Sequence, residues 1–86
     1  MLNLGGGSPT PSSDVIFDVT DATFMSDVID ASKERPIIVD FWAPWCGPCQ
    51  QVSPMLEALG ADYRGKLRVV KVNVDDNPKL SKTYNI

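Results

Sequence analysis

Two cysteines, Cys46 and Cys49, flank Gly47 and Pro48 in the run WCGPC. Thiols three positions apart can close a small disulfide and open it again. If a helix begins here, its free amides and the positive end of its dipole stabilise a thiolate on Cys46. Cys46 is then the attacking thiol that forms a mixed disulfide with a substrate, and Cys49 is the resolving thiol that attacks Cys46 and releases the reduced product. The motif therefore predicts a thiol/disulfide exchange site.

A zinc site and a purely structural disulfide are the two other interpretations of the cysteines. Zinc usually takes four nitrogen or sulfur ligands, and the chain has two cysteines and no histidine, so a complete zinc site would need a second chain. A purely structural disulfide would close so short a loop that it could restrict the unfolded chain only modestly. Closely spaced cysteines without a larger disulfide framework fit a reducing compartment. We therefore expect a redox pair, no metal, no cofactor and a cytoplasmic location.

Asp40 is the single charged residue in the apolar run 37–42. Such a run predicts a central parallel strand covered on both faces, which leaves the carboxyl group with little water. Burial favours the neutral form of a carboxyl group, so Asp40 is suited to take up a proton. We hypothesise that it accepts the proton of Cys49 during resolution, directly or through a water. The alternative is a carboxylate kept only for a hydrogen bond or an ion pair.

Strand and helix signals alternate around this site. Apolar and β-branched runs predict strands at 15–19, 37–42 and 67–74. Apolar residues at helical spacing predict helices over about 20–31 and 49–63, and Asn77 directly before Pro78 predicts a short helix over 78–84. Strands that alternate with helices require a parallel sheet with crossover connections, so the predicted fold class is α/β.

Several local signals refine these elements. Thr20 or Asp21 can cap the first helix, and Asn77 stands as a capping residue directly before a proline at the start of the third. Pro54 removes one backbone donor inside the second helix and predicts a kink there. Gly65 allows the turn that follows.

The sequence also predicts the roles of individual loop and core residues. Gly47 should let the backbone turn tightly, and Pro48 should limit flexibility at the helix start. Trp42 should pack against the cysteine loop, whereas Trp45 is the better surface candidate. The expected core or near-core residues on the helices are Phe24, Met25 and Met55.

Length and charge narrow the possible functions. The chain has 86 residues and a net charge of −3, which is enough for one small domain and leaves no basic stripe for phosphates. Nucleic acid is therefore an unexpected partner. No apolar run approaches the length of a bilayer span, and we expect no membrane association. Residues 1–14 are rich in Gly, Ser and Pro, which predicts a flexible leader without a function of its own.

The sequence resembles the thioredoxin family. The resemblance rests on VDFWAPWCGPC at 39–49, on Pro54 and on KVNVD at 71–75, and it covers about 15–86. It implies a thioredoxin-like fold, with Cys46 as nucleophile, Cys49 as resolving cysteine and Asp40 as proton acceptor.

The same resemblance implies roles for neighbouring residues. Trp45, Gly47 and Pro48 would form part of the surface that contacts substrate. Lys71 matches a family lysine near the buried carboxylate and would be the charge partner of Asp40. A solvated strand lysine is the alternative for Lys71.

Family members continue into a cis-proline loop, two further strands and a last helix. We expect 15–86 to be the N-terminal part of such a domain, a βαβαβα portion without the C-terminal β-hairpin and last helix. The strand at 37–42 would then be an exposed sheet edge able to pair with another chain, which permits self-association.

Two classes of function follow from these resemblances. The first is a protein-disulfide reductase that acts on disulfide-containing proteins and is recharged by a thioredoxin reductase. The alternative is a redox-linked client-binding module or an inactive fragment. The run at 23–32, leading into 36–40, is similar to thioredoxin-like co-chaperones that carry tetratricopeptide repeats, which would favour the binding module.

Overall fold

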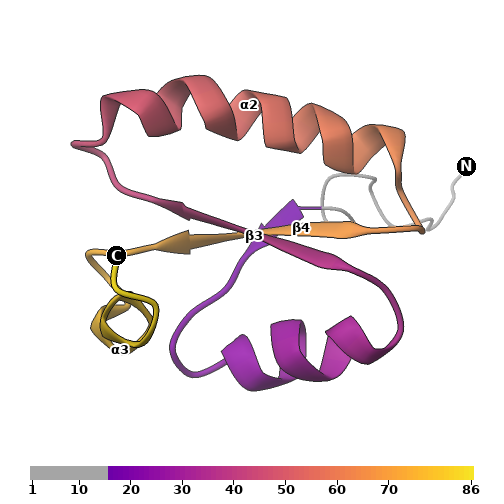
Figure 1. Ribbon diagram of the computed structural model, residues 1–86, viewed down its shortest axis with the longest axis horizontal. Helices are drawn as coiled ribbons and strands as arrows, with labels where there is room; N and C mark the ends of the chain where they lie inside the picture. Colours follow the sequence, from indigo (N-terminus) through magenta and orange to yellow (C-terminus); the bar gives the residue numbers. More distant parts are fainter. Residues whose placement is uncertain (1–15) are drawn as a thin grey trace, which may run out of the picture.

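The computed structural model describes residues 16–86, so the expected leader and Val15 lie outside the described residues. Strands and helices alternate along the chain as expected, which confirms the α/β class (Figure 1). The elements in chain order are β2 (Ile16–Asp18), η1 (Met25–Asp30), η2 (Ala31–Lys33), β3 (Ile37–Trp42), α2 (Gly47–Asp62), β4 (Arg68–Asn73) and α3 (Pro78–Thr83).

The three strands form one parallel sheet in the order β2-β4-β3. The middle strand is β4, and its Val69, Val70 and Val72 are completely buried. In the register of β3 and β4, Asp40 lies opposite Lys71. Within residues 16–86, β3 pairs with β4 alone and is therefore a sheet edge, as expected.

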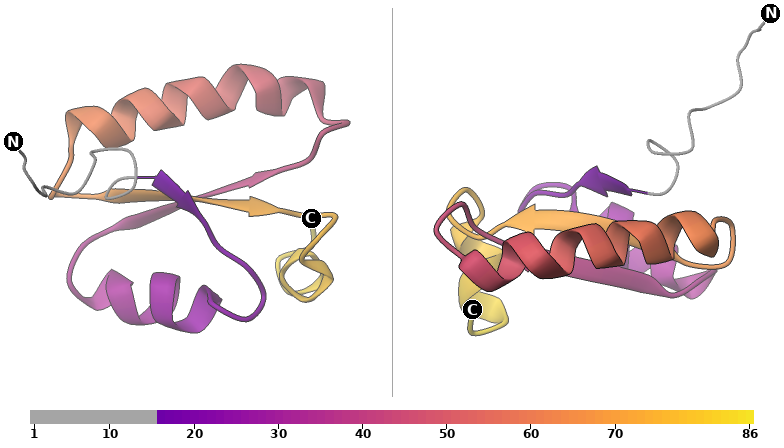
Figure 2. Two further views of the ribbon diagram at one scale, coloured as in Figure 1. Left: turned by 180° about the vertical axis from the view of Figure 1, so that it is seen from behind. Right: turned by 90° about the horizontal axis from the view of Figure 1, so that it is seen from above.

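Helices cover both faces of the sheet. Helix α2 lies along one face, while η1 and α3 lie on the other (Figures 1 and 2). None of the helices in the described part of the chain is long and apolar enough to cross a bilayer. The turn between α2 and β4 contains Gly65 at φ 87°, a left-handed conformation that glycine adopts without strain.

The packed core lies between the sheet and the helices η1 and α3. Phe24 is only 8% exposed, which confirms its predicted place in the core. The ring of Tyr84 contacts the rings of Phe24 and Phe41, with centroids 5.8 and 5.7 Å apart. The core cluster is made of Val19, Phe24, Val28, Val70, Val72 and Leu80.

Two predicted core residues are wrong: Met25 is 64% exposed and Met55 is 70% exposed. On the first helical segment, Phe24 and Val28 face the sheet, and Met25 lies outside this pair. On α2, the buried residues are Ser53 and Gly60, whereas Val52 and Met55 are exposed. The apolar spacing of α2 therefore predicts the helix correctly but not the face that it buries.

The first helical segment differs from a regular α-helix. Its main element, η1, is a π-helix, and a single 3₁₀ turn, η2, follows directly. These helix types differ from the α-helix by one residue in the hydrogen-bonding partner, a difference that a short apolar pattern does not reveal.

The side chains that cap the helices differ from those predicted from the sequence. The carboxylate of Asp21 accepts hydrogen bonds from the backbone N–H groups of Lys79 (3.2 Å) and Leu80 (3.0 Å), so it caps α3 and not the first helix. Asn77 precedes Pro78 but makes no side-chain cap. Its amide oxygen instead accepts the backbone N–H of Asp21 at 2.9 Å. Asp21 thus ties the loop after β2 to the start of α3.

Replacing Asp21 with Ala should lower the free energy of unfolding by about 1 kcal/mol, because two amides at the start of α3 lose their acceptor. Asp21→Asn keeps one acceptor oxygen and should lose less. Urea unfolding of the three proteins, followed by circular dichroism, measures the difference. Equal stabilities for Asp21→Ala and the unmodified chain would contradict the cap.

Candidate active site

The cysteine pair stands at the N-terminus of α2. Cys46 is the N-cap residue in an extended conformation (φ −91°, ψ 99°), and the helix begins at Gly47 with Pro48 in its first turn. The loop before it is closed by a hydrogen bond from the Cys46 N–H to the carbonyl of Ala43 at 3.1 Å. Proline suits this first turn, where its missing N–H would have no helical partner. The predicted position of both cysteines relative to the helix is confirmed.

Cys46 and Cys49 are joined by a disulfide, with their Cα atoms 5.3 Å apart. The sulfur of Cys46 accepts a hydrogen bond from the backbone N–H of Cys49 at 3.3 Å. An anion on Cys46 would therefore meet a donor as well as the positive end of the helix dipole. The sulfur of Cys49 lies 3.9 Å from the carbonyl oxygen of Phe41, at the end of β3.

Gly47 is the first residue of α2. Its φ is not positive, and a Cβ placed there would meet nothing within 4 Å. The backbone turn therefore does not require glycine. What Gly47 provides is open space beside the cysteines.

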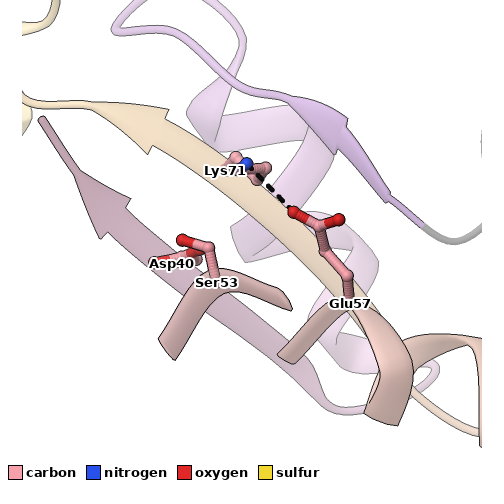
Figure 3. A network of polar contacts seen from close by, with 4 residues as sticks. All are labelled: Asp40, Ser53, Glu57 and Lys71. Atoms are coloured by element: carbon pink, nitrogen blue, oxygen red, sulfur yellow. Dashed lines mark hydrogen bonds and ion pairs between the residues drawn. The ribbon is translucent and has the colours of Figure 1, made fainter. Parts of the chain in front are cut away.

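Asp40 is buried beneath α2, as predicted, with 6% of its surface exposed. Its Oδ2 accepts a hydrogen bond of 2.6 Å from the hydroxyl of Ser53, which is itself 9% exposed (Figure 3). Ser53 is not among the site residues predicted from the sequence. A signal was available, because Ser53 comes four residues after Cys49 and so lies on the same face of α2, one turn further on.

Lys71 does not form the predicted ion pair with Asp40. Its Nζ lies 3.1 Å from Oε2 of Glu57 and 5.4 Å from the ring centroid of Trp42. Figure 3 shows Lys71 reaching from β4 toward Glu57 on α2. The Lys71 and Glu57 side chains are 24% and 42% exposed, so their charges keep part of their hydration. Placing the ammonium beside the buried Asp40 carboxylate would cost more of that hydration.

A cavity of about 310 Å³ lies between α2 and the sheet. The residues that line it include Trp42, Cys49, Ser53, Glu57 and Lys71. Among the described residues, Asp40 does not belong to this lining. A smaller pocket of about 60 Å³ is lined by both cysteines together with Trp45, Val74 and Ile86.

Trp45 lies at the surface, as the sequence suggested. Trp45 is 73% exposed, and its indole N–H lies 3.1 Å from both carboxylate oxygens of Asp75. Trp42 is half-buried, and its buried indole nitrogen has no hydrogen-bond partner among residues 16–86. Gly47 and Pro48 are exposed beside Trp45 at the start of α2. The exposed surface around the disulfide is therefore formed largely by Trp45, Gly47 and Pro48.

Comparisons with known proteins agree with this geometry. The family model of thioredoxin matches residues 15–86. A thioredoxin 1 from a Nostoc species is 50% identical over 68 residues, which cover 79% of this chain and 62% of the relative. The thioredoxin of Porphyra purpurea is 48% identical over 71 residues, 83% of this chain and 64% of the relative.

A third relative combines two activities in its name. The bifunctional thioredoxin reductase/thioredoxin of Mycobacterium leprae is 44% identical over 72 residues, which are 84% of this chain and 15% of that protein. The present chain thus spans less than two thirds of the length of the Nostoc and Porphyra thioredoxins.

A double-mutant cycle can test the partner of Lys71. Glu57→Gln and Lys71→Met should show a coupling free energy of about 0.5 kcal/mol, because their charges are paired but partly hydrated. The coupling should weaken in high salt. The matched cycle of Asp40→Asn with Lys71→Met should give a smaller value, and a larger one would restore the originally predicted pair. Urea unfolding supplies all the free energies.

Proposed function

Because the chain belongs to the thioredoxin family, we propose that it reduces protein disulfides by cycling between a Cys46/Cys49 dithiol and their disulfide. We propose that residues 15–86 are the N-terminal part of the thioredoxin domain that carries this activity. The observation that carries the proposal is the position of Cys46. It caps α2, accepts the Cys49 N–H and is already joined to Cys49 by a disulfide.

The first step is attack on the substrate. In the reduced chain, the Cys46 thiolate attacks one sulfur of a substrate disulfide, whose S–S bond breaks as the mixed disulfide forms. The departing substrate thiolate takes a proton from water. The N-terminus of α2 and the Cys49 amide support this step, because they favour the thiolate over the thiol at Cys46.

The second step is resolution by Cys49. Its thiol gives up a proton, with Asp40 as the proposed acceptor, and the resulting thiolate attacks the sulfur of Cys46. The bond between Cys46 and the substrate breaks, and the second substrate thiolate leaves. Overall, one substrate disulfide is reduced by two electrons while the chain's own dithiol is oxidised. The burial of Asp40 close to α2 supports its role as base.

The partners follow from this cycle. Trp45, Gly47 and Pro48 form the proposed contact surface for disulfide-containing proteins, and their exposure supports that role. A thioredoxin reductase is the proposed source of electrons. The printed name of the Mycobacterium leprae relative, which joins such a reductase to a thioredoxin, supports this pairing. A cytoplasmic location fits, because the site works as a reductase only where thiols are kept reduced.

A client-binding module is the second candidate function. Val52 and Met55 on α2 are 46% and 70% exposed, and Trp45 is 73% exposed at the start of the same helix. Exposed apolar side chains of this kind can hold an unfolded client. Such a module would bind clients with little turnover.

Insulin reduction with thioredoxin reductase and NADPH separates the two candidates. The unmodified chain should turn over, and Cys46→Ser should abolish turnover because no thiolate remains to attack the substrate. Cys49→Ser should stop turnover while trapping a mixed disulfide on Cys46, visible by mass spectrometry without reductant. Turnover that survives Cys46→Ser would contradict the reductase, and client binding without turnover would favour the module.

Asp40→Asn tests the proposed base. Resolution should slow roughly 100-fold near neutral pH, because general base assistance is lost. Attack by Cys46 should keep its rate. Stopped-flow measurement of thiolate release from dithiobis-nitrobenzoate, supplied below the protein concentration, resolves the two steps. An unchanged rate and pH profile of resolution would show that Asp40 is not the base.

A further inference from the structure

Ser53 stands between the buried carboxylate and the cavity beside Cys49. Its hydroxyl donates to Oδ2 of Asp40 at 2.6 Å, and its side chain lines the 310 Å³ cavity. Asp40 is 6% exposed and is absent from the lining, whereas Cys49 belongs to it. Among the described residues, Ser53 is therefore the lining residue that is hydrogen-bonded to Asp40.

The helix also aligns Ser53 with the resolving cysteine. Cys49 and Ser53 are four residues apart on α2, so they lie on one face with a separation of roughly 6 Å along the axis. That spacing suits one bridging water between the two side chains. Ser53, Glu57 and Lys71 supply polar atoms to the cavity, which makes it suitable for holding water.

We propose that Ser53 is a positioning residue for resolution, whose hydroxyl holds the Asp40 carboxylate and connects it to the proton of Cys49. The proposal rests on the proposed function, because it needs Asp40 as the base in a disulfide-reducing cycle. It adds a residue that the sequence motif does not contain.

The proton path is balanced at each atom. The Cys49 thiol passes its proton to a water in the cavity, and that water passes a proton to the Ser53 oxygen. The proton that Ser53 already donates moves to Oδ2 of Asp40, which becomes a carboxylic acid. The Cys49 thiolate then bonds to the sulfur of Cys46 while the bond from Cys46 to the substrate breaks. The substrate leaves as the thiolate, so no further oxidant or reductant is needed.

Other charged groups face the same cavity. Glu57 on α2 and Lys71 on β4 line it as an ion pair, with nitrogen and oxygen 3.1 Å apart. Because their charges compensate each other, the net electrostatic effect on Asp40 is smaller than that of either group alone. Glu57→Gln is therefore a necessary control for any change in the resolution rate that is assigned to Asp40.

The experiment measures resolution in the full 86-residue chain with dithiobis-nitrobenzoate as probe. The first thiolate release is bimolecular and reports attack by Cys46, while the second is unimolecular and reports resolution by Cys49. Ser53→Ala should slow the second release roughly tenfold, less than Asp40→Asn, because water can still reach part of the path. The first release should not change.

Rescue by a hydroxyl separates positioning from a merely structural role. Ser53→Thr keeps a hydroxyl and has the cavity beside it to take the extra methyl group, so this variant should restore the rate of the second release.

Two further variants complete the design. Adding Ser53→Ala to Asp40→Asn should slow resolution no further, because Ser53 acts through Asp40. Ser32→Ala is the matched control, since its hydroxyl donates to the carbonyl of Ile29 at 2.7 Å, on the opposite side of the sheet. It should leave both releases unchanged.

Each other outcome overturns the proposal in a recognisable way. If Ser53→Ala resolves at the rate of the unmodified chain while Asp40→Asn resolves slowly, Ser53 has no role in resolution. The proposed function is then unaffected. Additive slowing in the double variant, or failure of Ser53→Thr to restore the rate, shows that Ser53 does not act through its hydroxyl on Asp40. Absence of a second release from the unmodified chain removes the proposed function itself.

A measurement on the unmodified chain tests the relay even if Ser53→Ala does not fold. Resolution rates in mixtures of H₂O and D₂O should curve downward with the deuterium fraction, because more than one proton moves along the path. A straight line would contradict the relay. Circular dichroism shows whether each variant is folded.

Discussion

The hydrogen bond from Ser53 to Asp40 joins strand β3 to helix α2 at a point where both groups are buried. A buried carboxyl group without a partner carries a large free-energy penalty, so this contact restricts how α2 can be rotated over the sheet. That rotation places Cys49, one turn earlier on α2, on the lining of the cavity. Cys46 is the N-cap of the same helix, where the helix dipole favours a thiolate. The orientation of the cysteine pair over the sheet therefore depends on a polar contact beneath the helix.

The two faces of the sheet differ in what they contain: one carries the apolar core, and the other carries the polar groups and the cysteine pair. On the face that carries η1 and α3, apolar side chains pack into the core, and Asp21 connects the loop after β2 to the start of α3. On the α2 face, the helix buries Ser53 and Gly60 and leaves Met55 exposed. Hydrophobic stabilisation comes mainly from the first face. The α2 face provides polar groups, a cavity and exposed apolar side chains.

Charge is also distributed by burial on the α2 face. The Lys71–Glu57 ion pair stays at the partly exposed part of the cavity, where each group keeps some hydration. Asp40, deeper in the protein, is paired with a neutral hydroxyl instead. A neutral donor satisfies the carboxyl group without burying a second charge beside it, which would be costly.

The sequence by itself determined the features that depend on neighbouring residues. These are the disulfide-forming motif at a helix start, the alternation of strands and helices, the burial of Asp40 and the turn at Gly65, because spacing and local conformation are properties of short segments. The tertiary structure decided the contacts between distant segments. Lys71 lies opposite Asp40 in the sheet yet pairs with Glu57, Asp21 caps α3 and not the nearby helix, and Met55 faces away from the core. Such contacts depend on how α2 and α3 sit on the sheet, since each side chain selects the partner that best balances hydration against pairing. Ser53 became part of the site for the same reason: only the packing of α2 against β3 brings its hydroxyl to Asp40.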